Sequence, residues 1–132
     1  MNLTSRFILF RLPVVLYAGL IFFLSSGPVP SAELANIPDY YLHFSEYCLF
    51  YLATFWAIHE GFRPLQGRGS YWLPAVLTIL FGISDEFHQM FVPSRVASVL
   101  DVLADSAGAA AGTAVALFIH RLNGPVSDQA ES

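Results

Sequence analysis

The sequence predicts an all-α, polytopic membrane protein, a bundle of four transmembrane helices with both termini in the cytoplasm. Three observations carry this prediction. Hydrophobic residues make up 55% of the 132 residues and charged residues only 12%, about half the charged share of a typical soluble domain. The mean hydropathy is +0.57, and a single domain this small has too little interior to hide so much apolar surface from water. Finally, four apolar runs of about one bilayer thickness alternate with polar segments.

The first apolar run covers residues 7–24. Arg11 lies near its start, where a long side chain can extend to the lipid headgroups. Pro13 falls in the first turns, where the missing N–H matters least. A cleaved signal peptide is the alternative interpretation of this run, but Pro28 and Pro30 make poor cleavage sites. We therefore interpret the run as the first membrane-spanning helix.

Three further runs follow. A loop with three prolines at 27–38 leads to the second apolar run, 40–58. The helix that contains this run is predicted to begin at or just before Asp39. Residues 59–70 contain three glycines, a proline and two arginines, and are typical of a polar connection. The third run covers 71–91 and is ended by Pro93, with a tight turn at 93–97 and Arg95 at its tip. The fourth run covers 98–119. Residues 1–122 are thus predicted to form one membrane domain and residues 123–132 a disordered polar tail.

The arginines predict the orientation. If the four runs span alternately, only Arg95 lies on one side, and the other five lie opposite: Arg6, Arg11, Arg63, Arg68 and Arg121. This is the positive-inside pattern of a multi-pass protein of the plasma (inner) membrane. The chain has no lysine, and its scattered arginines indicate no nucleic-acid partner. The single cysteine, Cys48, excludes an internal disulfide.

Polar residues of all four runs are expected in one layer, ~5–10 Å below the outer boundary. Within the runs they recur at helical spacings, three or four residues apart. Ionisable residues facing lipid are costly, so these stripes should face one another. The stripes are Asp39, His43, Glu46 and Tyr47; Asp85, His88 and Gln89; and Asp101, Asp105, Gly108 and Gly112. The glycines allow a neighbouring helix to approach closely.

Charge favours a functional site over a structural network. Six carboxylates face Arg95 and two histidines, so some must share protons unless a cation is present. A purely structural network would more cheaply use serine, threonine and asparagine. The candidate catalytic residues are His43, Glu46, Asp85 and His88. The candidate substrate-binding residues are Ser26, Tyr47, Glu86, Gln89, Arg95, Asp101 and Asp105.

Two of these assignments have alternatives. Arg95 is either a salt-bridge partner of Asp101 or Glu86, or a clamp for a phosphate or carboxylate that arrives from the outer leaflet. His43, Glu46 and His88 with a further carboxylate would suit a divalent metal by ligand type. Their spacing matches no recognised metal signature, so the sequence assigns no metal site and no cofactor.

At these residues the chain resembles the VanZ-like family of small bacterial membrane proteins. The matching motifs are Phe-Leu-Ser-Ser at 23–26, Asp39 to Tyr47, Asp85 to Gln89, and Pro93-Ser94-Arg95 leading to Asp101 and Asp105-x-x-Gly108. Tyr40 stands where the family pattern usually has a lysine, and Asp105 where it usually has an asparagine. The name-giving member is linked to low-level teicoplanin resistance, a link that similarity alone does not transfer to this chain.

Three functions remain open. In the first, an enzyme or binding protein acts on a lipid-linked or cell-envelope substrate at the outer face, and its partners are the bilayer and that substrate. In the second, the chain is a non-enzymatic structural or accessory subunit whose polar layer only holds the bundle together. The third is a transporter, which four short helices without a through-going polar path disfavour.

Overall fold

The computed structural model describes residues 1–28, 36–62 and 71–123, and within these ranges the chain is helical and contains no strand. The all-α prediction is confirmed, with helices close to the four predicted runs. The elements are α1 (Leu3–Arg6), the π-helical turn η1 (Phe7–Arg11), α2 (Leu12–Ser25), α3 (Asp39–His59), α4 (Trp72–Gln89) and α5 (Val99–Leu122). Arg63, Arg68 and all of the predicted polar tail except Asn123 lie outside the described residues.

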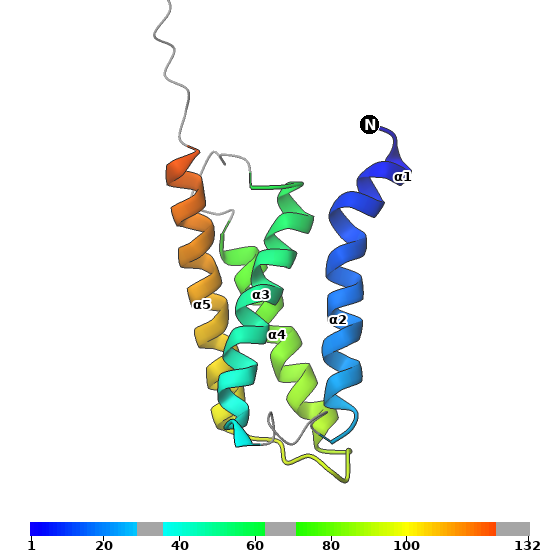
Figure 1. Ribbon diagram of the computed structural model, residues 1–132, viewed down its shortest axis with the longest axis vertical. Helices are drawn as coiled ribbons and strands as arrows, with labels where there is room; N and C mark the ends of the chain where they lie inside the picture. Colours follow the sequence, from blue (N-terminus) through cyan, green and yellow to red (C-terminus); the bar gives the residue numbers. More distant parts are fainter. Residues whose placement is uncertain (29–35, 63–70, 124–132) are drawn as a thin grey trace, which may run out of the picture.

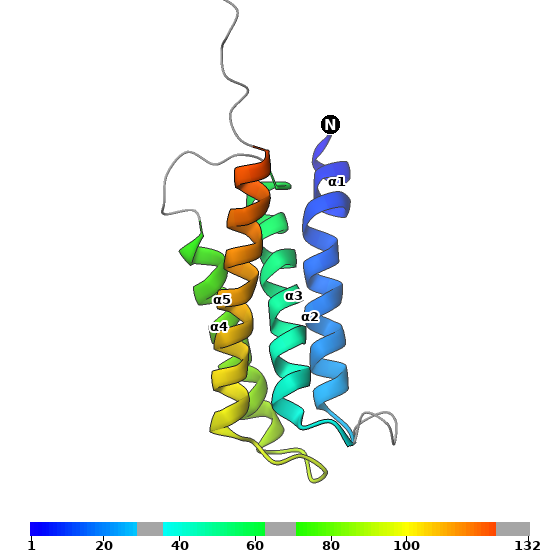
Figure 2. The ribbon, with the colours of Figure 1, turned by 60° about the vertical axis from the view of Figure 1, so that its left-hand side comes forward.

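The long helices run antiparallel to their neighbours in sequence (Figures 1 and 2). The N-terminus and the end of α5 lie at one end of the bundle, which we call the terminal end. At the opposite end α2 and α4 finish and α3 and α5 begin (Figure 1). We call this the acidic end, because it carries Asp39, Asp85, Glu86, Asp101 and Asp105 near the helix ends.

A proline shapes the first helical segment. Pro13 has no N–H to donate to the carbonyl oxygen of Leu9, four residues earlier. The indole N–H of Trp56 on α3 donates to this oxygen instead, at 3.2 Å. The π-helical turn η1 ends at Arg11, shortly before Pro13. The proline therefore leaves an acceptor that joins the first segment to α3.

Local sequence also sets the helix ends. The Ser98 side chain accepts a hydrogen bond from the backbone N–H of Leu100 and caps α5. After α3, Glu60 has a φ of 53° and Gly61 a φ of 117°, and the left-handed geometry at Gly61 favours glycine. Helix α4 ends at Gln89, earlier than predicted: hydrogen-bonded turns replace the helix before Pro93 is reached.

Helices α3 and α5 approach each other most closely, as the small-residue stripe on the fourth run predicted. A Cβ atom on Gly108 would lie 2.4 Å from the carbonyl oxygen of Phe44, and one on Gly112 would lie 2.9 Å from that of Cys48. Both values are far below van der Waals contact. Only glycine at these positions allows the two backbones to meet.

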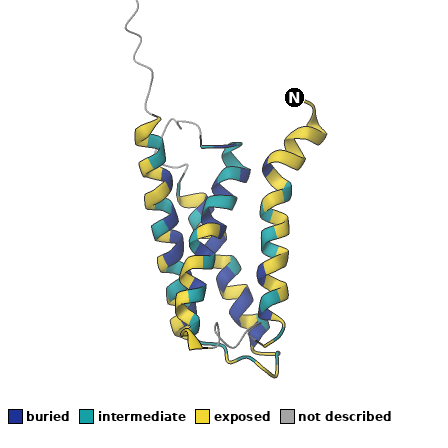
Figure 3. Cartoon of the chain, viewed as in Figure 1, coloured by how far each residue is buried: buried dark blue, intermediate teal, exposed yellow. Residues whose placement is uncertain are grey.

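Large apolar side chains cover much of the outside of the bundle, whereas the buried faces of α3, α4 and α5 turn toward each other (Figure 3). Among the described residues, two helical segments are long and apolar enough to cross a membrane, Leu3–Ser25 and Val99–Leu122. Only 11% and 28% of their most apolar windows are buried. These segments therefore expose apolar surface, unlike the core helix of a soluble protein, which is mostly buried.

Candidate functional site

Polar side chains from all four long helices meet at the acidic end, as the sequence predicted. Seven of them are at most 5% exposed: Ser25, His43, Asp85, Glu86, Gln89, Asp101 and Asp105. Helix geometry explains the gathering, because residues three or four apart share a face and that face is turned inward on each helix. We refer to this set as the polar layer.

His43 lies at the centre of the polar layer. Its Nδ1 atom is 2.9 Å from Oδ1 of Asp105 on α5, and its Nε2 atom is 3.7 Å from Oε1 of Glu86 on α4. The imidazole is nearly parallel to the Tyr47 ring, with centroids 6.0 Å apart. The second oxygen of Glu86 accepts the backbone N–H of Ser98 at 2.8 Å. One histidine is thereby held between carboxylates of two other helices.

Asp85 forms a second group. The Ser25 hydroxyl donates to Oδ2 of Asp85 at 2.8 Å, which joins α2 to α4. The Gln89 amide donates to the same oxygen at 3.3 Å, one turn along α4. The other oxygen, Oδ1, has no hydrogen-bond donor among the described residues. Asp85 is thus a buried carboxylate with one free acceptor.

His88 lies apart from His43. Its Nε2 atom is 3.0 Å from the Ser26 hydroxyl, and its ring stacks on Phe22 with centroids 4.1 Å apart. Within the described ranges, no hydrogen bond or ion pair joins His43 to Asp85 or to His88. The predicted acid–base residues thus fall into two places, one around His43 and one along the α2–α4 contact.

Arg95 contacts neither of the two carboxylates that the salt-bridge prediction named. Its Nη1 atom pairs with Oδ2 of Asp39 at 3.3 Å. Its Nε and Nη2 atoms donate to the carbonyl oxygens of Gly27 and Leu24, each at 2.8 Å. The expected pairing with Asp101 or Glu86 is wrong because the turn after α4 passes under the end of α2, where the two carbonyl oxygens and Asp39 capture the guanidinium.

Glu46 and Tyr47 border this arrangement. The Glu46 carboxyl lies within electrostatic range of His43 and Asp85, and the backbone carbonyl of Glu46 accepts the Tyr17 hydroxyl at 3.3 Å. Tyr47 is fully buried, and its hydroxyl has no partner in the part of the chain that the structure describes. Both residues face the polar layer rather than the outside of the bundle.

Five buried polar atoms in or beside the layer lack a hydrogen-bond partner among the described residues: Tyr47 Oη, Asp85 Oδ1, Glu86 Oε1, Gln89 Oε1 and Asp105 Oδ2. A network that evolved only to hold helices together would satisfy its members, because an unpaired buried polar atom costs about 1–3 kcal/mol. Groups of this kind point to water, an ion or a ligand that completes them.

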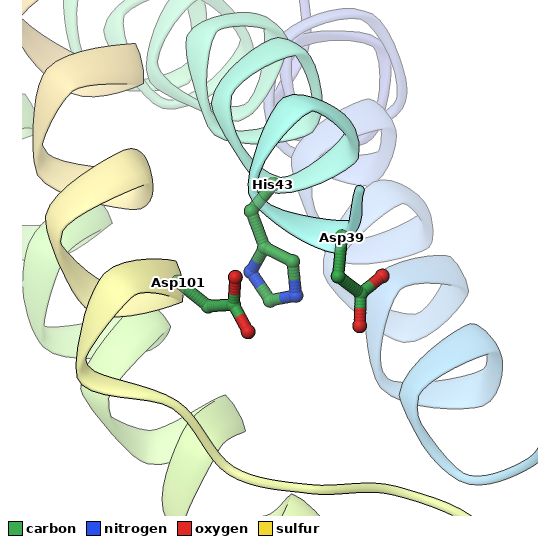
Figure 4. A group of neighbouring side chains, drawn as sticks. All are labelled: Asp39, His43 and Asp101. Carbon is green, nitrogen blue, oxygen red and sulfur yellow. The ribbon is translucent and has the colours of Figure 1, made fainter. Parts of the chain in front are cut away.

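Three of the polar side chains have the spacing of metal ligands (Figure 4). Asp39, His43 and Asp101 each offer a ligand atom, and these atoms lie within 4.8 Å of one another. Figure 4 shows the imidazole between the two carboxylates. Asp39 and His43 come from α3 and Asp101 from α5.

Among the described residues, two grooves lie near the acidic end. The first, of about 630 Å³, lies between α4 and α5 and is lined by Glu86 and Arg95 together with apolar residues that include Phe87, Met90 and Val102. The second, of about 660 Å³, lies between α3 and α5, and its lining includes Tyr40, Phe44, Leu100, Leu103 and Ala107. Of the two, the α4–α5 groove is the one whose lining includes charged residues of the acidic end.

Sequence reasoning missed some of the contacting residues. It selected Ser26 as a site residue, whereas Ser25 is the serine buried against Asp85. It placed Asp39 on the same helical face as His43 but did not give it a role. The backbone N–H of Ser98, which holds Glu86, left no signal in the sequence, because any non-proline residue supplies this donor.

The fold and the site define a class: a small helical bundle with two candidate membrane spans among its described residues and a buried, carboxylate-rich layer at one end. The VanZ/LLP1 family model matches residues 10–120. The chain therefore belongs to the VanZ/LLP1 family, and the resemblance seen in its motifs is confirmed. No curated protein and no solved structure matches the chain.

Proposed function

We propose that all four long helices cross the inner membrane of a bacterium, with both termini in the cytoplasm and the acidic end at the outer face. Helices α3 and α4 have 21 and 18 residues, or ~32 and ~27 Å at ~1.5 Å per residue, close to the thickness of a hydrocarbon core. Their polar residues, gathered toward the acidic end, lower their mean hydropathy. The arginine distribution along the chain supports the orientation.

The polar layer is proposed to bind or process an amphipathic substrate, a lipid-linked or cell-envelope compound that reaches it from the outer leaflet. The α4–α5 groove is the observation that carries this proposal. Most of its lining is apolar, and it suits an acyl or prenyl chain, while Glu86 and Arg95 place charge beside it. A lipid with a polar head could occupy both parts at once.

Arg95 keeps the capacity to bind such a head. A guanidinium has five N–H donors, and three different nitrogens are engaged in one hydrogen bond each. Two donors, one on each terminal nitrogen, remain for a phosphate or carboxylate. Glu46, Tyr47, Gln89, Asp101 and Asp105 would complete the polar part of the site. Ser26 would hold His88 at its edge.

Proton transfer is the chemistry that this site could supply. His43 lies between two carboxylates, and Asp85 and His88 are the next titratable groups along α4. A histidine paired with a carboxylate is a common general acid–base arrangement. Whichever bond of the substrate reacts, His43 with Asp105 is the pair best placed to move a proton.

A structural role is the alternative. Ser25 and Asp85 join α2 to α4, and Arg95 joins the turn after α4 to the end of α2 and to α3. These contacts favour a layer that fixes helix positions in an accessory subunit. The unpartnered buried atoms at the same layer weigh against a purely structural network.

Lipid retention tests the proposal. Val102 lines the α4–α5 groove, so Val102→Trp should fill it. Val115 lies on the same helix, is 40% exposed and lines neither groove, so Val115→Trp is the matched control. Native mass spectrometry of protein in mild detergent should show a retained lipid on the wild type and on Val115→Trp, and its loss from Val102→Trp. Absence of lipid from the wild type, or equal loss from both variants, contradicts the proposal.

A further inference from the structure

The geometry around His43 points to a binding site for a divalent first-row transition metal, such as Mn²⁺ or Zn²⁺. We propose that Asp39, His43 and Asp101 are its ligands and that Glu86 supplies a further oxygen. This site does not depend on the proposed lipid substrate, since an ion could bind here whatever the protein acts on. With a metal bound, His43 would be a ligand and would not carry the proton in the transfer proposed above.

The hydrogen bond between His43 and Asp105 prepares the ring for a metal. Nδ1 lies 2.9 Å from a carboxylate oxygen of Asp105, so the Nδ1–H of a neutral imidazole is donated there. The lone pair is then on Nε2. Histidine ligands in metalloproteins commonly donate their other N–H to a carboxylate in this way, which fixes the tautomer and strengthens the ligand. Asp105 would be the outer partner of the site.

The opposite nitrogen faces an oxygen that needs a partner. Oε1 of Glu86 is buried, has no hydrogen-bond donor within the described ranges, and lies 3.7 Å from Nε2 of His43. Without a proton or a cation between them, these two acceptors repel. If a metal lay about 2.1 Å from each of these atoms, their separation would correspond to an Nε2–metal–Oε1 angle of about 120°. The gap therefore fits a metal ion.

Two further carboxylates are grouped with His43, and Glu86 would join them by a movement of its side chain toward the ion. Asp39, His43 and Asp101 have ligand atoms within 4.8 Å of one another (Figure 4). Asp101 is 4% exposed, whereas the Asp39 side chain is 37% exposed and opens the site to the boundary of the bundle. One imidazole with several carboxylates is a donor set for Mn²⁺, Fe²⁺ or Zn²⁺. A divalent cation would also offset the excess of carboxylates over cationic side chains at this end.

The site escaped the sequence analysis because its ligands come from three helices. Asp39 and His43 are one turn apart on α3, but Glu86 and Asp101 join them only through the packing of α4 and α5. Ligands that lie far apart in the sequence form no short motif from which such a set could be predicted. His88, which the ligand types had suggested, is held by Ser26 and Phe22 instead.

Metal titration tests the site. Protein stripped with EDTA in detergent is titrated separately with MnCl2, followed by electron paramagnetic resonance, and with ZnCl2, followed by calorimetry. At least one ion should bind with a stoichiometry of one per chain. His43→Gln and Asp101→Asn should each raise its Kd by about 100-fold or more, and Asp105→Asn by about tenfold, the range known for outer-shell partners.

His88→Gln is the matched control, because His88 lies at the same end of the bundle but outside the ligand set. The Kd of this variant should stay at the wild-type value. If His43→Gln does not fold, as judged by circular dichroism and gel filtration, Asp101→Asn supplies the measurement. The site is overturned if neither ion binds stoichiometrically, because a proton on Nε2 of His43 or on Glu86 would then account for the close approach of the two atoms. It is also overturned if His88→Gln weakens binding as much as the ligand variants. Lipid retention is measured independently, so either result stands without the other.

Discussion

Gly108→Ala should separate α5 from α3 and disturb the polar layer. The added Cβ atom would lie 2.4 Å from the carbonyl oxygen of Phe44 and 2.9 Å from the backbone N of Cys48. Both neighbours are backbone atoms, so no side chain can rotate away. Ordinary contact begins at 3.4 Å, and the helices must therefore move apart by about 1 Å locally.

The magnitude follows from three contributions. Forced overpacking costs about 1–3 kcal/mol. Asp105 lies one turn before Gly108 and His43 directly before Phe44, so the same displacement would stretch the 2.9 Å hydrogen bond between His43 and Asp105 beyond its range; a bond of this type is worth about 1.5–3 kcal/mol. Alanine regains about 1 kcal/mol through its higher helix propensity. The free energy of unfolding should fall by about 1.5–5 kcal/mol.

Gly19→Ala is the matched control, because Gly19 lies within α2 and a Cβ atom there would meet nothing within 4 Å. Its stability should rise by up to about 1 kcal/mol. The free energy of unfolding is measured by SDS titration in mixed micelles, with thermal unfolding in the same detergent as a second readout. If Gly108→Ala is as stable as the wild type, the close α3–α5 contact does not exist. The described contact between His43 and Asp105 in the polar layer would then also be wrong.

Three further outcomes are expected. In a background without the native cysteine, Ser94→Cys should react with a membrane-impermeant maleimide in intact cells and Asn123→Cys only after lysis; labelling in the reverse order would invert the proposed orientation. Ser25→Ala should lower the free energy of unfolding by about 1–3 kcal/mol in an SDS titration, because its buried aspartate acceptor loses its shorter hydrogen bond; an unchanged titration midpoint would show that the bond contributes nothing. Asp105→Asn should change the melting temperature of metal-free protein little, because the amide oxygen can still accept from His43; a large loss would show that the negative charge itself is needed.

Much of the fold could be predicted from sequence because long apolar runs alternate with clearly marked polar segments. Apolar runs of membrane length located the four long helices within a few residues at most ends, and proline and glycine marked the segments between them. The inward face of each helix also followed from spacing, since ionisable residues three or four apart had to avoid lipid. These two rules together placed His43, Asp85 and Asp105 at one end of the bundle.

Pairings across helices could not be predicted in the same way. Which carboxylate meets His43 depends on the rotation of each helix about its axis and on how closely α3 and α5 approach. Arg95 shows the limit most clearly. The sequence suggested Asp101 or Glu86 as its partner, but the turn after α4 carries it to Asp39 and to two carbonyl oxygens. Backbone acceptors are present at every residue, so sequence alone does not reveal them.

The presence of an amphipathic substrate site at the acidic end can be tested with crystals of the protein grown from a lipidic mesophase. We predict continuous elongated density in the α4–α5 groove, along Phe87, Met90 and Val102, that ends in a polar group within hydrogen-bonding distance of Arg95 or Glu86. A groove closed by its own side chains, beside a polar layer whose atoms are all paired within the protein, would contradict it and favour the structural role.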